Sequence, residues 1–186
     1  MNSSTLLGKI HELDTEPHPI IDDELSEASV MVLLHKHEEE LCILLTERAA
    51  HLKHHASQIS FPGGRFETND ESLLETALRE TEEEVGVSAE DIQVIGQLEP
   101  VETLTGYRIY PYVGYIEVLP ELNIDPNEVA DAFSVKATLL LDAEKYRRVE
   151  VEVFEQKRHF YELQYEERRI WGATAGILYR LARQLS

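Results

Sequence analysis

The chain has 186 residues, 42% of them hydrophobic, so it is long enough to bury a core and short enough for one domain over residues 1–186. A net charge of −19 argues against a nucleic acid as the main ligand, because such binders present a basic face. The chain shows no secretory leader pattern and no apolar run of about 18 residues, so we expect a cytoplasmic protein that does not bind membranes. Cys42 has no partner cysteine, which excludes a disulfide framework.

The first part of the chain predicts a helix followed by a β-hairpin. Apolar residues at helical spacing over residues 3–13 indicate a short amphipathic helix. Residues 28–34 and 41–46 are apolar and are separated by the polar segment 35–40. This pattern predicts two strands joined by a solvated loop.

The rest of the chain mixes strands and helices in an irregular order. The run Pro62-Gly63-Gly64 predicts a sharp change of direction before a helix over residues 70–85. Downstream, the pattern predicts three strands, at 92–101, 107–118 and 149–165. It also predicts a loop or short helix over 120–132 and a final helix over 171–184. This order favours an α/β sandwich with a mixed sheet over a doubly wound parallel sheet.

The predicted final helix carries two glycines and begins with the only tryptophan. Gly172 and Gly176 are four residues apart and predict close packing of this helix on the domain, because its apolar stretch is too short for a membrane span. Trp171 is predicted to lie in the core.

The helix over residues 70–85 has an apolar stripe on one face and carboxylates on the other. Glu80, Glu83 and Glu84 are three and four residues apart, which brings their side chains together. Acidic groups at the C-terminal end of a helix oppose its dipole by about 0.3–1 kcal/mol each. Without its neighbours, this run is also compatible with a solvated charged face. Clustered carboxylates at an unfavourable place indicate a site for a hard cation, for which Mg²⁺ is the natural candidate.

The glycine turn before this helix adds a second element of chemistry. Gly63 and Gly64 allow the backbone to approach a phosphate closely. A bound cation would neutralise diphosphate oxygens and activate a water molecule. The combination predicts hydrolysis of a diphosphate.

The residues that carry this chemistry resemble the Nudix box, G-x5-E-x7-R-E-U-x-E-E-x-G-U. Gly64, Glu71 and the run 79–87 (RETEEEVGV) follow this pattern. Six residues separate Gly64 from Glu71 instead of five, so Asp70 and Glu71 are both candidates for the first acidic position. Thr81 replaces the usual bulky aliphatic residue.

The resemblance implies a fold, a metal and residue roles. The fold is the Nudix fold, an α/β/α sandwich with a mixed β-sheet. Glu80 and Glu84 are implied metal ligands, Glu83 shares ligation or positions the water, and Arg79 orients these carboxylates. The cation is Mg²⁺, with Mn²⁺ as the alternative.

A wider resemblance is to the coenzyme A pyrophosphatase branch of the family. Residues 44–48 (LLTER), Leu52 and 58–64 (QISFPGG) match the signature of that branch, with Ser57 in place of its usual glycine. Segments further along, to about residue 180, are also similar, so the resemblance covers roughly 28–180. It implies hydrolysis of coenzyme A or its thioesters to 3′,5′-ADP and 4′-phosphopantetheine or its acyl form.

Further candidate residues flank the box. Arg48, Lys53 and His54 are candidate phosphate contacts, because charge-assisted bonds to phosphate are strong. A loop carboxylate commonly serves as the base in Nudix enzymes, and Glu128 is the candidate here with Asp131 as its alternative. Other Nudix substrates such as ADP-ribose, and a non-catalytic binding module, are the competing functions. Both a monomer and a homodimer are compatible with the sequence.

Overall fold

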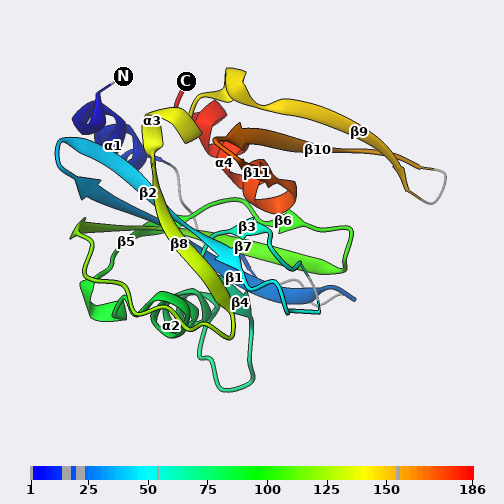
Figure 1. Ribbon diagram of the computed structural model, residues 1–186, viewed down its shortest axis with the longest axis horizontal. Coiled ribbons are helices and arrows are strands. Elements are labelled where there is room, and N and C mark those ends of the chain that lie inside the picture. Colours follow the sequence, from blue (N-terminus) through cyan, green and yellow to red (C-terminus); the bar gives the residue numbers. More distant parts are fainter. Residues whose placement is uncertain (1, 14–17, 20–23, 54, 154–155) are drawn as a thin grey trace.

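The computed structural model describes residues 2–13, 18–19, 24–53, 55–153 and 156–186 (Figure 1). In this part of the chain, helices cover both faces of a mixed sheet, which confirms the predicted α/β/α arrangement. No helix among the described residues is long and apolar enough to cross a bilayer.

The central sheet has eight strands, built around the order β3-β2-β1-β7-β5. Strands β1 and β7 pair in parallel, whereas β2 pairs in an antiparallel manner with β1 and β8. The strands of this sheet are β1 (Ser26–His37), β2 (Glu40–Arg48), β3 (Ile59–Ser60), β4 (Gly63–Arg65), β5 (Gln93–Gln97), β6 (Val101–Glu102), β7 (Tyr107–Val118) and β8 (Val129–Lys136).

Each face of the sheet has its own apolar cluster. On one face, Met31 and Leu33 of β1 pack with Ala77 and Val85 of helix α2 (Leu73–Val85). The opposite face packs against helices α1 (Ser3–His11) and α4 (Gly172–Gln184). Successive residues of β1 therefore contribute to opposite layers, as expected for a central strand buried on both faces.

A second, three-stranded antiparallel sheet lies on the α4 side of the molecule (Figure 1). Its order is β11-β10-β9, with β9 (Arg147–Val153), β10 (Gln156–Tyr165) and β11 (Arg168–Trp171). The predicted single strand over 149–165 is therefore wrong, because this segment folds back on itself as β9 and β10. Short helical turns complete the chain: η1 (Ala89–Asp91), α3 (Ala137–Leu140) and η2 (Ala143–Lys145).

Two other predictions need correction in the connecting segments. The hairpin strands extend to His37 and restart at Glu40, so the predicted loop over 35–40 is reduced to two residues. His35 is buried in β1, where one ring nitrogen lies 2.7 Å from the Ser134 hydroxyl and the other lies 3.2 Å from the Lys36 carbonyl. The predicted loop or short helix over 120–132 contains the start of β8.

The prediction of close packing through Gly172 and Gly176 is wrong. A Cβ atom at either position would meet nothing within 4 Å among the described residues. Gly172 has a φ of +67°, a left-handed conformation that favours glycine, so its role is in the turn from β11 into α4. Trp171 is half-buried, not a core residue.

Helix α2 has well-defined ends. The Ser72 hydroxyl accepts a hydrogen bond from the Glu75 N–H, and Gly86 at φ +75° donates from its N–H to the Glu82 carbonyl. These interactions satisfy backbone groups that a helix end leaves without partners. The helix starts three residues after the predicted position, because Asp70 lies in the preceding turn.

Candidate metal and diphosphate site

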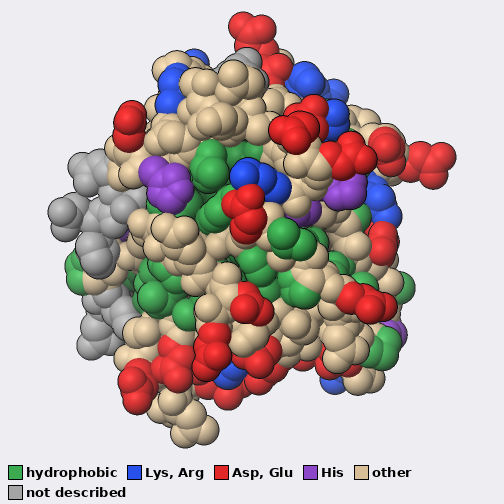
Figure 2. Space-filling model, turned by 90° about the vertical axis from the view of Figure 1, so that its left-hand side faces the viewer, with side chains coloured by type: hydrophobic (Ala, Val, Ile, Leu, Met, Phe, Trp, Pro, Cys, Tyr) green, Lys and Arg blue, Asp and Glu red, His purple; other side chains and the backbone are tan. Residues whose placement is uncertain are grey.

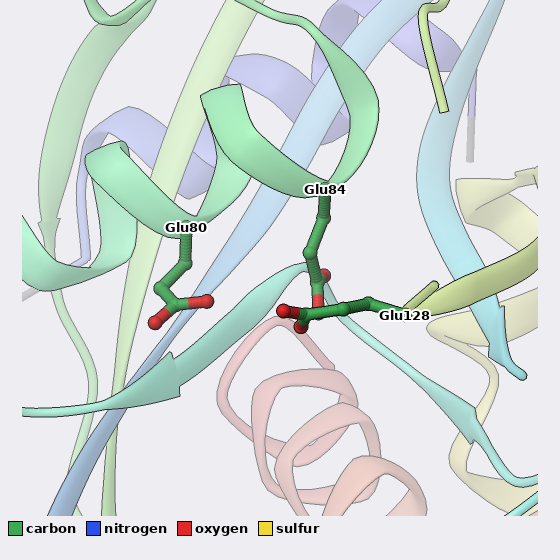
Figure 3. Close-up of side chains that lie close together, drawn as sticks. All are labelled: Glu80, Glu84 and Glu128. Carbon is green, nitrogen blue, oxygen red and sulfur yellow. The ribbon is translucent and has the colours of Figure 1, made fainter. Parts of the chain in front are cut away.

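Three carboxylates converge beside the C-terminal half of α2. One oxygen from each of Glu80, Glu84 and Glu128 lies within 4.8 Å of the others. Figure 3 shows the Glu128 side chain reaching toward that of Glu84 from a separate segment, with Glu80 one helical turn away on the same face of α2. Glu84 is buried, Glu80 is half-buried and Glu128 is exposed. Two of the three predicted metal ligands, Glu80 and Glu84, are therefore brought together with the predicted base.

The loop before β8 is held against the end of α2 by backbone hydrogen bonds. The N–H groups of Asn123 and Asp125 donate to the carbonyls of Val85 and Glu84 at 3.0 and 3.1 Å. At the other end of this loop, the Ala49 N–H donates to the Glu128 carbonyl at 2.8 Å. The loop thus uses the free carbonyls of the helix end as anchors, and this fixes where Glu128 emerges.

Burial dominates the electrostatics of Glu84. Desolvation raises the pKa of Glu84 to about 8, and the charges of Glu80 and Glu128 act in the same direction. Two partners favour the ionised form: the Gly63 N–H at 3.3 Å from Oε2, and Arg48 Nη1 at 3.7 Å from Oε1. Desolvation likewise raises the pKa of Glu80, against the opposing effect of Arg79. The positive groups near Glu84 and Glu80 in the described structure therefore do not offset the effect of burial on either pKa.

Arg79 organises the outer side of the cluster. Its guanidinium donates to Asp70 through Nε at 2.9 Å and Nη2 at 3.0 Å, and through Nη1 to Glu80 and Glu83 at 2.9 Å each. Glu83 is 60% exposed and lies outside the three-carboxylate cluster. The structure therefore places Glu83 as a partner of Arg79, outside the group that Glu80, Glu84 and Glu128 form.

The two candidates for the first acidic position are distinguished by this pairing. Asp70 is buried and accepts further hydrogen bonds from Thr76 Oγ1 and the Glu67 N–H, whereas Glu71 is exposed. The Arg79 guanidinium holds the pKa of Asp70 well below its usual range. Counted to Asp70, the spacing from Gly64 is the expected five residues, so the additional residue lies between Asp70 and Arg79. That spacing was the available sequence signal for this assignment.

The glycine turn packs directly against the acidic residues. A Cβ atom at Gly64 would lie 2.3 Å from the Glu80 carboxylate, and one at Gly63 would lie 2.3 Å from the Ser29 carbonyl. Glycine at these positions lets the Glu80 carboxylate lie over the backbone and lets the Gly63 N–H reach Glu84.

The remaining predicted residues fall in different places. Arg48, at the end of β2, lies beside Glu84. Asp131 is paired with Arg168, so Glu128 and not Asp131 faces the cluster. Lys53 is exposed on the segment after β2, and His54 lies outside the described residues. The prediction did not include Arg168, which comes from β11.

The fold and the site together match one family. A mixed sheet between helices, with an acidic helix behind a glycine turn, is the Nudix architecture, and the family model for the NUDIX domain matches residues 25–156. The Nudix hydrolase NudL of Pectobacterium atrosepticum, itself uncharacterised, is 37% identical over 77% of this chain and 75% of its own. The uncharacterised NudL of Photorhabdus laumondii is 36% identical over 94% of this chain and 92% of its own length. The chain therefore belongs to the Nudix hydrolase family.

Solved structures confirm the fold at lower sequence identity. The MutT/nudix family protein from Enterococcus faecalis gives a TM-score of 0.53 at 18% identity, covering 96% of this chain and 67% of that chain. The C. elegans Ap4A hydrolase in a binary complex gives a TM-score of 0.52 at 17% identity, covering 60% of this chain and 80% of that chain. Nudix hydrolases act on small diphosphate-containing molecules with divalent metal ions.

Proposed function

We propose that this protein is a Mg²⁺-dependent pyrophosphohydrolase that cleaves the diphosphate of coenzyme A or its thioesters. The observation that carries the proposal is the convergence of Glu80, Glu84 and Glu128 within 4.8 Å. The resemblance of residues 44–64 to the coenzyme A pyrophosphatase signature supports the substrate class. The arginine of that signature, Arg48, lies 3.7 Å from Glu84.

The donor set fits a hard divalent cation. All three groups are carboxylates, which Mg²⁺ and Mn²⁺ both accept. Burial of Glu84 beside two other acids is unfavourable for the ionised form and is offset when a cation is bound. Mg²⁺ is the first candidate, and Mn²⁺ is the alternative.

Each residue around the cation has a distinct role in this proposal. Glu80 and Glu84 would hold the metal, which would neutralise the diphosphate charge and lower the pKa of a bound water molecule. Glu128 accepts the proton of the attacking water, since it is the exposed member of the cluster. Arg79 orients Glu80 by a direct hydrogen bond, and Glu83 helps to hold Arg79 in place.

The diphosphate is held from the opposite side. Arg48 donates charge-assisted hydrogen bonds to phosphoryl oxygens, and the backbone at Gly63 and Gly64 lines the approach. Lys53 and His54 are proposed as additional phosphate contacts from the segment after β2. These groups counter the acidic surface: Figure 2 shows Asp and Glu side chains gathered along the lower edge of one face of the molecule.

The proposed reaction is a simple hydrolysis. A water oxygen bonds to one phosphorus, the bridging P–O bond breaks, and one proton passes to Glu128 and then to solvent. Coenzyme A yields 3′,5′-ADP and 4′-phosphopantetheine, and a thioester yields the acyl form of the latter.

A substrate comparison tests this proposal. The protein is incubated with coenzyme A, ADP-ribose and a dinucleoside polyphosphate, with Mg²⁺ or Mn²⁺, and the products are identified by mass spectrometry. The proposal requires 3′,5′-ADP and 4′-phosphopantetheine, formed faster than the products of the other substrates. Cleavage of ADP-ribose with coenzyme A untouched would show that the substrate assignment is wrong.

A further inference from the structure

Arg168 of β11 lies across the ends of two strands that lead into the candidate site. Its Nη2 lies 2.5 Å from the Asp131 carboxylate of β8, and its Nε lies 3.6 Å from Glu47 of β2. The guanidinium also lies 4.1 Å from the centre of the Phe133 ring. Residue 168 is beyond the segment 25–156 matched by the family model, so this contact comes from an element outside that segment.

Glu47 and Asp131 are direct partners in the β2–β8 ladder. Like charges opposite each other in a sheet are destabilising, so this pair requires a cation between its carboxylates. Isolated surface ion pairs contribute little, but here one guanidinium contacts two acids and a ring at once. Arg168 is the cation that contacts both carboxylates.

The Glu47–Asp131 pair is the last regular pair before the site. A shift in register follows between Glu47 and Arg48, after which Arg48 pairs with Val129. Arg48 contacts Glu84, and Glu128 immediately precedes Val129 in the chain. The alignment of β2 with β8 at this point therefore sets the relative positions of Arg48 and Glu128.

We propose that Arg168 is a positioning residue for the diphosphate site, which holds Arg48 and Glu128 in register by neutralising and bridging Glu47 and Asp131. This inference rests on the proposed function of the carboxylate cluster. Loss of Arg168 would also leave the acids Glu47 and Asp131 uncompensated beside Arg48, which would raise KM for an anionic substrate through repulsion.

Arg169 provides a matched control for the experiment. It is the next residue on the same strand, it is paired with Glu162, and its guanidinium lies near the rings of Phe160 and Trp171. It has no described contact with β2 or β8. Arg168→Ala and Arg169→Ala therefore both remove an ion-paired arginine from β11, but only the first removes the link to the site.

The test compares wild type, Arg168→Ala, Arg168→Lys and Arg169→Ala. We measure Mn²⁺ affinity by titration calorimetry, kcat and KM on a diphosphate that the wild type cleaves, and the thermal midpoint. We expect Arg168→Ala to lose about 10- to 100-fold in kcat/KM and to bind Mn²⁺ more weakly, as for residues that support metal ligands. Arg168→Lys should recover part of both losses, and Arg169→Ala should resemble wild type in both.

The outcomes separate the two proposals. Equal kcat/KM and equal Mn²⁺ affinity in Arg168→Ala and Arg169→Ala would overturn the positioning role. If Arg168→Ala does not fold, Arg168→Gln, which removes the charge and keeps a polar side chain, takes its place, and wild-type values of both quantities in that variant would overturn the role. If the wild type cleaves no diphosphate, the proposed function fails, and the Mn²⁺ titration still decides whether Arg168 supports the cluster.

Discussion

The Arg79 guanidinium and the Asp70 carboxylate form a two-point pair, with Nε to Oδ1 at 2.9 Å and Nη2 to Oδ2 at 3.0 Å. Because Arg79 also bonds Glu80, this pair connects the turn before α2 to a candidate metal ligand. Charge-assisted two-point pairs of this type fix orientation as well as adding stability.

Replacement of Asp70 is the first test of this connection. We expect Asp70→Asn to lose about 1.5–3 kcal/mol of unfolding free energy at pH 7, because hydrogen bonds to a charged group are lost. The exposed neighbour offers a control, and Glu71→Gln should stay within about 0.5 kcal/mol of wild type. Urea denaturation measures both. An equal loss in the two variants would contradict the pairing of Arg79 with Asp70.

The same pair predicts a pH dependence. Folding lowers the pKa of Asp70. The stability that Asp70 contributes is therefore complete above its pKa in the unfolded state, about 3.9, and is lost as pH falls toward its pKa in the folded state. The difference in stability between wild type and Asp70→Asn should therefore narrow as pH falls below about 4. Denaturation at pH 7 and pH 3 checks this, and an undiminished difference at pH 3 would contradict it.

Glu84 predicts the opposite trend for protein without metal. Burial raises the pKa of Glu84 to about 8, so the folded state binds this proton more tightly than the unfolded state. The stability that Glu84 contributes is then present below its pKa in the unfolded state, about 4.3, and is lost as pH rises toward 8, its pKa in the folded state. In EDTA, the thermal midpoint of wild type relative to that of Glu84→Gln should fall between pH 5 and pH 8. A constant difference would contradict the buried, uncompensated carboxylate.

Gly64 predicts a specific loss of metal affinity. A Cβ atom there would lie 2.3 Å from the Glu80 carboxylate, so Gly64→Ala should displace that side chain. We expect the variant to fold and to bind Mn²⁺ about 10-fold or more weakly. Gly176→Ala is the matched control, since a Cβ atom there meets nothing within 4 Å, and it should gain about 0.5–1 kcal/mol in helix α4. Unchanged Mn²⁺ affinity in Gly64→Ala would remove Glu80 from the proposed ligands.

Glu128 can be tested as the base by its pH profile. Glu128→Gln should lower kcat by about 10²–10⁴-fold and should remove the fall in kcat at acidic pH. Glu121 is an exposed acid in the same loop, so Glu121→Gln should leave kcat and its fall at acidic pH unchanged. An acidic limb that survives in Glu128→Gln would assign the base to another group.

Parts of this fold follow directly from sequence pattern and others do not. Helix α2 was predictable because its apolar stripe repeats at helical spacing and Gly86 marks its end. The hairpin of β9 and β10 was missed because residues 149–165 contain no glycine, proline, asparagine or aspartate to signal a turn. Strand β8 was missed because its apolar alternation is interrupted by short polar residues.

Some features of the candidate site could likewise be predicted from the sequence and others could not. Glu80 and Glu84 share a face through their spacing alone, so their proximity was predictable. The choice of Asp70 over Glu71 depends on the geometry of the turn before the helix, and local periodicity does not determine it. Arg168 contacts Glu47 and Asp131 from a second sheet, and sequence spacing does not reveal these contacts.

The central claim is that Glu80 and Glu84 would hold a divalent cation beside the base Glu128, and that this site hydrolyses the diphosphate of coenzyme A. The most direct measurement is coenzyme A turnover in Mg²⁺ by wild type and Glu84→Gln, with folding of both checked by urea denaturation. Our account predicts 3′,5′-ADP and 4′-phosphopantetheine from wild type and at least about 100-fold slower turnover by the folded variant. Wild-type rates in Glu84→Gln would contradict it.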